Sequence, residues 1–431
     1  MSPALARTFS SLKVPNYRKY FSGQLASITG NWMQTVGEMW LMVKLTGSGS
    51  LVGLTAGLQF LPILLFGAWG GLLADRLPKR RVLTYTQLSL AVPALTLFFL
   101  AASGAAQPWM VLALVLVRGA VLAIDNPSRQ SFVVEIVGPD RVVNAVALNS
   151  VVVHSSRILG PALAGGVIAL IGIAPCFLVN AFSFLAMFIA LRTMDARDLQ
   201  TPKPAAREPG EVKSALRYVR RTPELLVPLL MMALVGTISF NFQVLLPLLA
   251  DFTWHGTATT YALLTAAMGL GSVGGALAAG ARGRVSPKLL VGSSLLFGAA
   301  MLLAAAAPTL ELQILALIPL GAASVTFAAG VNSTLQIAVE PAMRGRVMAL
   351  YSVVFLGSTP IGAPLVGWLA GAAGPRAGLV AGAVAALIAG VAAWVWFARA
   401  GEVEPVRAAR PHGGRIRAPQ RLVAYARDRV S

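Results

Sequence analysis

Twelve long apolar runs, separated by short polar stretches, constrain this chain more than any other feature of its sequence. A helix rises about 1.5 Å per residue, so about 20 apolar residues cross the hydrocarbon core of a bilayer. The runs cover residues 21–45, 51–74, 82–103, 109–134, 143–171, 175–192, 225–250, 258–281, 288–307, 311–335, 346–372 and 376–398. Charged residues make up only 12% of the chain, against about 25% in soluble domains. We therefore predict an all-α integral membrane protein with about 12 transmembrane helices.

Basic residues gather on one side of these predicted helices. The N-terminus holds four, the stretch 70–81 four, the link 192–222 eight and the tail after residue 398 eight. The loops of the other side hold only Lys44 and Arg376. Because cytoplasmic loops are enriched in Lys and Arg, we expect a multi-pass protein of the plasma (inner) membrane with both termini in the cytoplasm.

A polar link with three prolines divides the runs into two sets of six. The expected divisions are a cytoplasmic N-terminus at 1–20, a six-helix bundle at 21–192, a cytoplasmic linker at 193–224, a second six-helix bundle at 225–398, and a basic, disordered tail at 399–431. The tail either fixes topology or binds anionic lipid.

The two sets also resemble each other in sequence. With a shift of 202 residues, ALNSVV at 147–152 aligns with ALYSVV at 349–354, and the same shift places Gly160 on Gly362 and Gly165 on Gly367. Two parallel repeats with a central site at the bilayer midplane are typical of transporters.

Other classes of function leave no signature in the chain. Its single cysteine, Cys176, excludes an internal disulfide and a cysteine metal cluster, and His154, His255 and His412 show no ligand spacing. We find no HExxH, no P-loop and no nucleophile–His–acid set, so we expect neither an enzyme nor a cofactor. A membrane enzyme or a receptor is the less favoured alternative to a transporter.

Polar side chains recur at helical spacing within several apolar runs, so that each set shares one helix face. A charge in hydrocarbon is costly, and such a face should meet a partner or a wet cavity. The residues expected to line a substrate cavity are Gln24, Asn31, Gln34, Glu38, Arg118, His154, Arg157, Asn241, Gln243, Asn332 and Gln336. The charged members all belong to the N-terminal half.

Depth in the membrane suggests a pair. Glu38 lies about 10 Å from the outer end of its helix and Arg118 about 14 Å from the outer start of its own, at 1.5 Å per residue. We expect Glu38 to alternate between a proton and an ion pair with Arg118 or Arg157, because an opposing charge favours the carboxylate and burial favours the acid. The alternative is a static buried pair that fixes helix packing.

The charged stretch GGLLADRLPKRR, at 70–81, joins the second and third runs. It is either a charged turn anchored in the cytoplasm or a conformational latch. As a latch, Asp125 would pair with Lys79, Arg76 or Arg80, and Asp75 would meet the helix N-terminus at 344–347. Gly160, Pro161 and Gly165 fit either a gating role or ordinary close helix packing.

These motifs resemble those of the major facilitator superfamily, over about residues 15–400. Residues 71–80 resemble its signature between helices 2 and 3, with Pro78 for the usual glycine and Lys79 for the usual arginine. Arg118-Gly119 resembles its buried arginine, and GPALAG at 160–165 resembles the motif typical of its exporters. NPSRQSFV at 126–133 and FNFQVLLPLLA at 240–250 look most like the enterobactin-exporter, or transmembrane secretion effector, branch.

The resemblance implies proton-driven export of a small molecule by a protein that we expect to be a monomer in the lipid bilayer, with no nucleic-acid partner. Two arginines against one deep acid favour an anionic or hydrogen-bonding solute, such as a catecholate siderophore, over a cationic drug. A broad multidrug or macrolide efflux pump is the alternative.

Overall fold

The structure is a computed structural model that describes residues 10–200, 211–282, 286–341 and 343–399. The tail beyond Arg399 and much of the linker therefore lie outside the described residues. Within those residues the chain is helical and contains no strand. The long helices follow the apolar runs, which confirms the predicted all-α membrane fold.

Six long helices form the N-terminal half: α2 (Pro15–Thr46), α3 (Gly49–Arg76), α4 (Lys79–Ala102), α5 (Pro108–Val137), α6 (Val142–Ile171) and α7 (Ala174–Arg192). Short 3-10 turns, η1 (Ser10–Lys13), η2 (Pro139–Arg141) and η3 (Ala196–Asp198), flank them. Within this half α2 packs against α6 and α7, and α3 and α4 both pack against α5.

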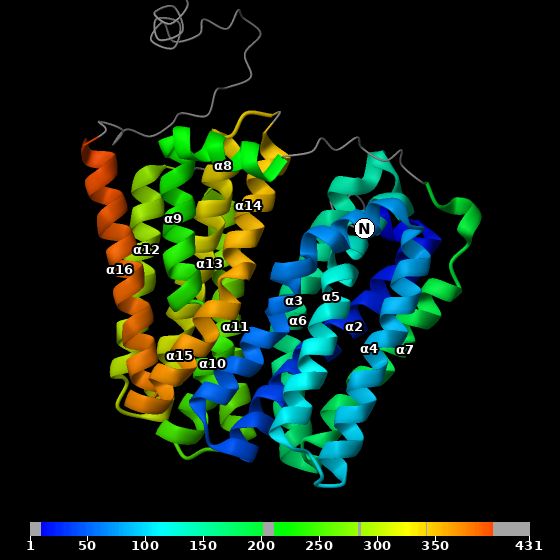
Figure 1. Cartoon of the computed structure of the whole chain (residues 1–431), viewed down its shortest axis with the longest axis horizontal. Coiled ribbons are helices and arrows are strands. Elements are labelled where there is room, and N and C mark those ends of the chain that lie inside the picture. The colour runs from blue at the N-terminus through cyan, green and yellow to red at the C-terminus, as the bar shows by residue number, and fades with distance from the viewer. Residues whose placement is uncertain (1–9, 201–210, 283–285, 342, 400–431) are drawn as a thin grey trace, which may run out of the picture.

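The C-terminal half holds α9 (Pro223–Ile238), α10 (Phe242–Leu248), the π-helix η4 (Leu249–Thr253), α11 (Ala258–Arg282), α12 (Pro287–Ala306), α13 (Leu310–Ala338), α14 (Arg344–Gly357), α15 (Thr359–Ala373) and α16 (Pro375–Arg399). In chain order α8 (Glu211–Arg221) comes just before this half, and it rests on α9 and α14 at one end of the molecule (Figure 1). We call this the linker end, and the opposite one the far end.

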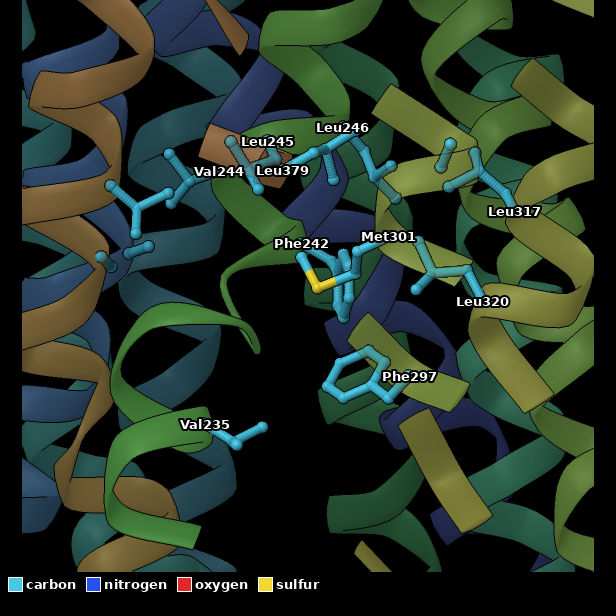
Figure 2. Packing of buried hydrophobic residues seen from close by; sticks show 14 of the residues in the cluster. Val235, Phe242, Val244, Leu245, Leu246, Phe297, Met301, Leu317, Leu320 and Leu379 are labelled. Carbon is cyan, nitrogen blue, oxygen red and sulfur yellow. The ribbon is translucent and has the colours of Figure 1, made fainter. Parts of the chain in front are cut away.

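Two expected spans are interrupted. The run 225–250 is split between α9 and α10. At the break the Asn241 side-chain amide donates to the Thr237 carbonyl oxygen at 2.7 Å, which gives this carbonyl a partner at the end of α9. The run 346–372 is split at Ser358, just before Pro360, which supplies no N–H to the helix. Figure 2 shows Phe242, Met301 and Phe297 packed beside the first of these breaks.

Eleven described segments are long and apolar enough to cross a membrane, and α2 is not one of them. This helix is nevertheless the longest, at 32 residues, and it replaces the expected run 21–45. Its polar face explains the difference: Gln24, Ser27, Gln34 and Glu38 are all buried in protein. A helix shielded by its neighbours does not need apolar side chains on every face.

The two halves meet at the far end and diverge toward the linker end (Figure 1). The backbones approach so closely that a Cβ on Gly53 of α3 would collide with the Ala363 carbonyl of α15, and one on Gly165 of α6 with Ala262 of α11. Close backbone approach of this kind is how small residues join membrane helices.

Candidate functional site

The predicted partners Glu38 and Arg118 lie in contact at the centre of the N-terminal half. Arg118 Nη2 on α5 is 2.7 Å from Glu38 Oε2 on α2, and both side chains are fully buried, with 0% exposure. The helix face that carries Glu38 turns toward α5 rather than toward lipid, which gives the carboxylate its partner.

Neutral polar groups surround this pair. Gln34 donates to Glu38 Oε1 at 2.7 Å, and Asn180 of α7 donates in turn to Gln34 Oε1 at 2.5 Å. On the other side, Arg118 Nη1 donates to Asn31 Oδ1 at 2.9 Å, and Thr35 lies 3.4 Å away. Buried charges are tolerated when their remaining hydrogen-bonding positions are filled in this way.

Two buried atoms of the pair have no hydrogen-bond partner among the described residues. These are Arg118 Nε and Glu38 Oε2, and the second of them makes the ion-pair contact with Arg118 Nη2. A proton on Glu38 would remove the attraction, and Arg118 would then need another acceptor.

Arg157 does not take part in this pair. It lies on α6, with its guanidinium carbon 5.3 Å from the ring centre of Trp32 on α2. The expectation that Glu38 pairs with either arginine is therefore met by Arg118 alone in this conformation. His154, one turn earlier on α6, has a side chain outside the described set.

The expected pairing of Asp125 with the charged stretch differs from the observed one. Asp125 Oδ2 lies 2.5 Å from Arg129 Nε, four residues along the same helix, and Thr86 and Gln87 of α4 donate to its other oxygen. Lys79 instead pairs with Glu135 at 2.6 Å.

The other members of the charged stretch also lie apart from Asp125. Arg80 donates to the carbonyl oxygens of Leu191 and Arg192 at 2.7 and 2.9 Å, and the Arg76 side chain is exposed. The side chain of Asp75 is outside the described set, so its expected contact with 344–347 remains a prediction.

The remaining cavity residues are distributed over both halves. Gln24 donates to Asn149 of α6, and Asn241 caps the end of α9. Gln243 is half-buried on α10, and on α13 Gln336 donates to Asn332 at 2.5 Å. These uncharged groups are not brought into contact with Glu38 or Arg118, so the residues do not form one compact site.

The proposed gating residues of α6 lie in tight packing. A Cβ on Gly160 would come within 2.5 Å of the Trp32 Cβ and 2.9 Å of the Thr29 carbonyl oxygen. Pro161 is buried, and Gly165 faces α11 of the other half. Close packing thus accounts for Gly160, whereas Gly165 lies between the halves.

Sequence reasoning missed a contact that joins the halves at the far end. Lys44 Nζ of α2 lies 2.5 Å from Asp251 Oδ1 of η4, and the ring of Trp40 stacks on Tyr261 with centres 6.2 Å apart. The pattern gave no sign of this contact, because Asp251 lies beyond a helix break that the apolar run conceals.

A cluster of rings in the C-terminal half was also missed. Phe240, at the break between α9 and α10, lies 5.2 Å from Phe297 and 5.5 Å from Phe355 between ring centres. Tyr351 stacks on Phe355 at 5.9 Å. Phe297 belongs to α12, whereas Tyr351 and Phe355 belong to α14, and the sequence does not reveal that these helices lie beside the break. In the described part of the chain, no three His, Cys, Asp or Glu side chains form a candidate metal site.

Comparison with known proteins agrees with this architecture. A family model for transmembrane secretion effectors matches residues 6–416. The staphyloferrin A transporter of Staphylococcus aureus is 26% identical over 293 residues, which is 66% of this chain and 72% of that one. The enterobactin exporter of Citrobacter koseri is 26% identical over 79% of this chain and 78% of its own length.

A macrolide efflux protein of Streptococcus pyogenes is 22% identical over 79% of this chain and 86% of its own length. In three dimensions, a bacterial homologue of the lysosomal transporter Spinster, solved in an inward-facing state, superposes with a TM-score of 0.72 at 16% identity, covering 92% of this chain and 97% of that one. The chain belongs to the transmembrane secretion effector family of major facilitator superfamily transporters.

Proposed function

We propose that this transporter is a proton-coupled exporter of a small molecule, with Glu38 as the proton carrier and Arg118 as its switching partner. The observation that carries the proposal is the fully buried contact of 2.7 Å between them. A carboxyl group enclosed in a membrane protein beside a single opposing charge is suited to hold a proton in one state and an ion pair in another.

The proposed cycle follows from the chemistry of the pair. When Glu38 is charged, Arg118 holds α5 against α2. Protonation of Glu38 removes that attraction and leaves a buried cation that gains by turning toward water or an anionic group. A static structural pair is the competing explanation, and the two differ in whether transport needs a titratable group at position 38.

We assign the linker end to the cytoplasm, because the basic residues of α8 and of the 76–81 stretch lie there. On this assignment the conformation is closed to the outside by the Lys44–Asp251 contact and the glycine-lined packing of α3 on α15. Both termini are then cytoplasmic, and the protein works as a monomer in the plasma (inner) membrane.

The substrate we favour is siderophore-like or another amphipathic solute. Two relatives are named for siderophores, and the charges within the N-terminal half include Arg118 and Arg157. A broad macrolide-type pump is the second candidate, favoured by the third relative and by the aromatic cluster around Phe240.

Everted vesicles test the proposal. After a pH gradient is imposed, catecholates, macrolides and dyes are added in turn to vesicles that carry the native chain, Glu38→Gln or Glu135→Gln. The last variant is a matched control, since Glu135 is also a buried, ion-paired carboxylate. We expect a substrate to dissipate the gradient with the native chain and the control but not with Glu38→Gln. Equal dissipation by Glu38→Gln would contradict the proposal.

A further inference from the structure

Arg157 is an ionised side chain without an ionised partner. It lies near the middle of the membrane-spanning helix α6, and no carboxylate of the described residues is within 4 Å of it. Charged residues within membrane-spanning segments almost always face a partner, the bundle interior or a water-filled space. Its charge is therefore available to a group that the chain itself does not provide.

The neighbours of Arg157 on α6 place it between the two halves. Its side chain is exposed, and Leu159, two residues along and so on the opposite side of the helix, is 47% exposed among the apolar residues that suit lipid. The adjacent Ile158 lies against Gly269 of α11 in the other half, and Arg157 itself lies over Trp32 of α2. An exposed side chain flanked by helices of both halves indicates an internal surface that a solute can reach.

The position of Arg157 is fixed by its neighbours. Its guanidinium lies over the Trp32 ring, at 5.3 Å from the ring centre. One turn away, Gly160 lets α6 approach the Cβ of Trp32, and Thr29 and Ser156 share a hydrogen bond of 2.9 Å. A guanidinium held against an aromatic ring loses little freedom when it binds a ligand, so the pair is preorganised.

We propose that Arg157 and Trp32 form the binding site for the carboxylate of a planar organic anion. The inference rests on the proposed export function and names the chemical class of its substrate. A guanidinium presents its N–H donors as a fork that matches the two oxygens of a carboxylate. Trp32 beside it is only partly buried, so it offers apolar surface to the body of the ligand, and the guanidinium repels a cation.

The site also adjoins the buried ion pair. Trp32 follows Asn31 in α2, and the Asn31 side chain accepts a hydrogen bond from Arg118 at 2.9 Å. A ligand that shifts Trp32 therefore acts on the residue next to the Arg118 contact. This adjacency gives anion binding a short route to the proton carrier.

Equilibrium binding to the purified full chain tests the inference with three probes of one shape: 2-naphthoate, neutral 2-naphthylmethanol and cationic 2-naphthylmethylamine. We expect the native chain to bind the carboxylate more tightly than the other two. Arg157→Gln should weaken naphthoate binding about tenfold or more and change the alcohol by less than about twofold. Arg157→Lys keeps the charge but not the forked donors, so its affinity for naphthoate should lie between those of the native chain and Arg157→Gln.

The matched control is Arg376→Gln, which removes another arginine stacked on a tryptophan, Trp254, at the far end. It should leave naphthoate binding unchanged. If the native chain prefers the alcohol or the amine, or if folded Arg157→Gln binds naphthoate as the native chain does, the inference is overturned. The binding assay uses no proton gradient, so its result can be separated from that of the vesicle assay. Anion binding without any proton movement in vesicles would overturn only the proposed proton coupling. Proton movement that cationic compounds drive would overturn only the proposed anion site.

Discussion

For single residues, burial separates the Glu38–Arg118 pair from the Lys44–Asp251 pair that joins the two halves. Both are fully buried, whereas the side chains of Lys44 and Asp251 are 51% and 22% exposed. Exposed pairs contribute about 0–1 kcal/mol, but breaking a buried pair by removing one partner costs about 3–5 kcal/mol. The first pair can therefore control helix packing in a way that the second cannot.

The sequence predicted the Glu38–Arg118 contact but not the partners of Asp125. Depth along a helix can be counted in residues, and a deep charge requires a deep partner. Near the helix ends several charges lie at similar depth, and their neighbours depend on how the helices pack. Lys79 forms its ion pair with Glu135, and Asp125 forms its ion pair with Arg129 instead.

A double-mutant cycle at the pair measures its strength. Arg118→Met should lower the unfolding temperature in detergent markedly, because it leaves Glu38 buried without a counter-charge. Glu38→Leu combined with Arg118→Met should recover most of that loss, since no unpaired charge remains. If the double variant is as unstable as the two losses added together, the residues do not act as a pair.

At the scale of elements, the apolar runs located the helices but concealed their interruptions. Hydropathy is averaged over a run, so the breaks before Phe242 and at Ser358 left it unchanged. Hydropathy misleads in the opposite direction for α2. The buried polar face of this helix lowers its mean hydropathy, although the helix packs among the membrane-spanning helices of its half. Both effects arise because hydropathy reports composition and not the surroundings of each face.

The packing of α3 on α15 provides a test at this scale. Gly53→Leu should force the two helices apart, since even a Cβ there meets the backbone of Ala363. We expect a cysteine placed at exposed Ser50 to react several-fold faster with an impermeant maleimide as the far end opens. The native cysteine, Cys176, is buried and should stay silent.

Gly71→Leu is the control for that experiment, because Gly71 lies on the same helix with open space around it. It should leave the labelling rate unchanged. Equal rates in both variants and the parent would show that α3 and α15 do not close the far end.

At the scale of the whole molecule, the two halves differ in chemistry although they repeat in sequence. The N-terminal half contains the buried charges, and the C-terminal half contributes the rings around Phe240. The repeat and the resemblance predicted the two-bundle plan, because spacing within each half is preserved. The contacts between the halves could not be predicted, since they depend on the conformation that the molecule adopts.

We propose that the charge on Glu38 sets which end of the transporter is open. Spin labels at Ser50 and Ala373, both exposed at the far end on α3 and α15, allow the distance between the halves to be measured across pH without any substrate. We predict that the distance distribution of the native chain shifts between acidic and alkaline conditions, while Glu38→Gln gives one distribution throughout. A pH response that persists in Glu38→Gln would show that another group controls the opening.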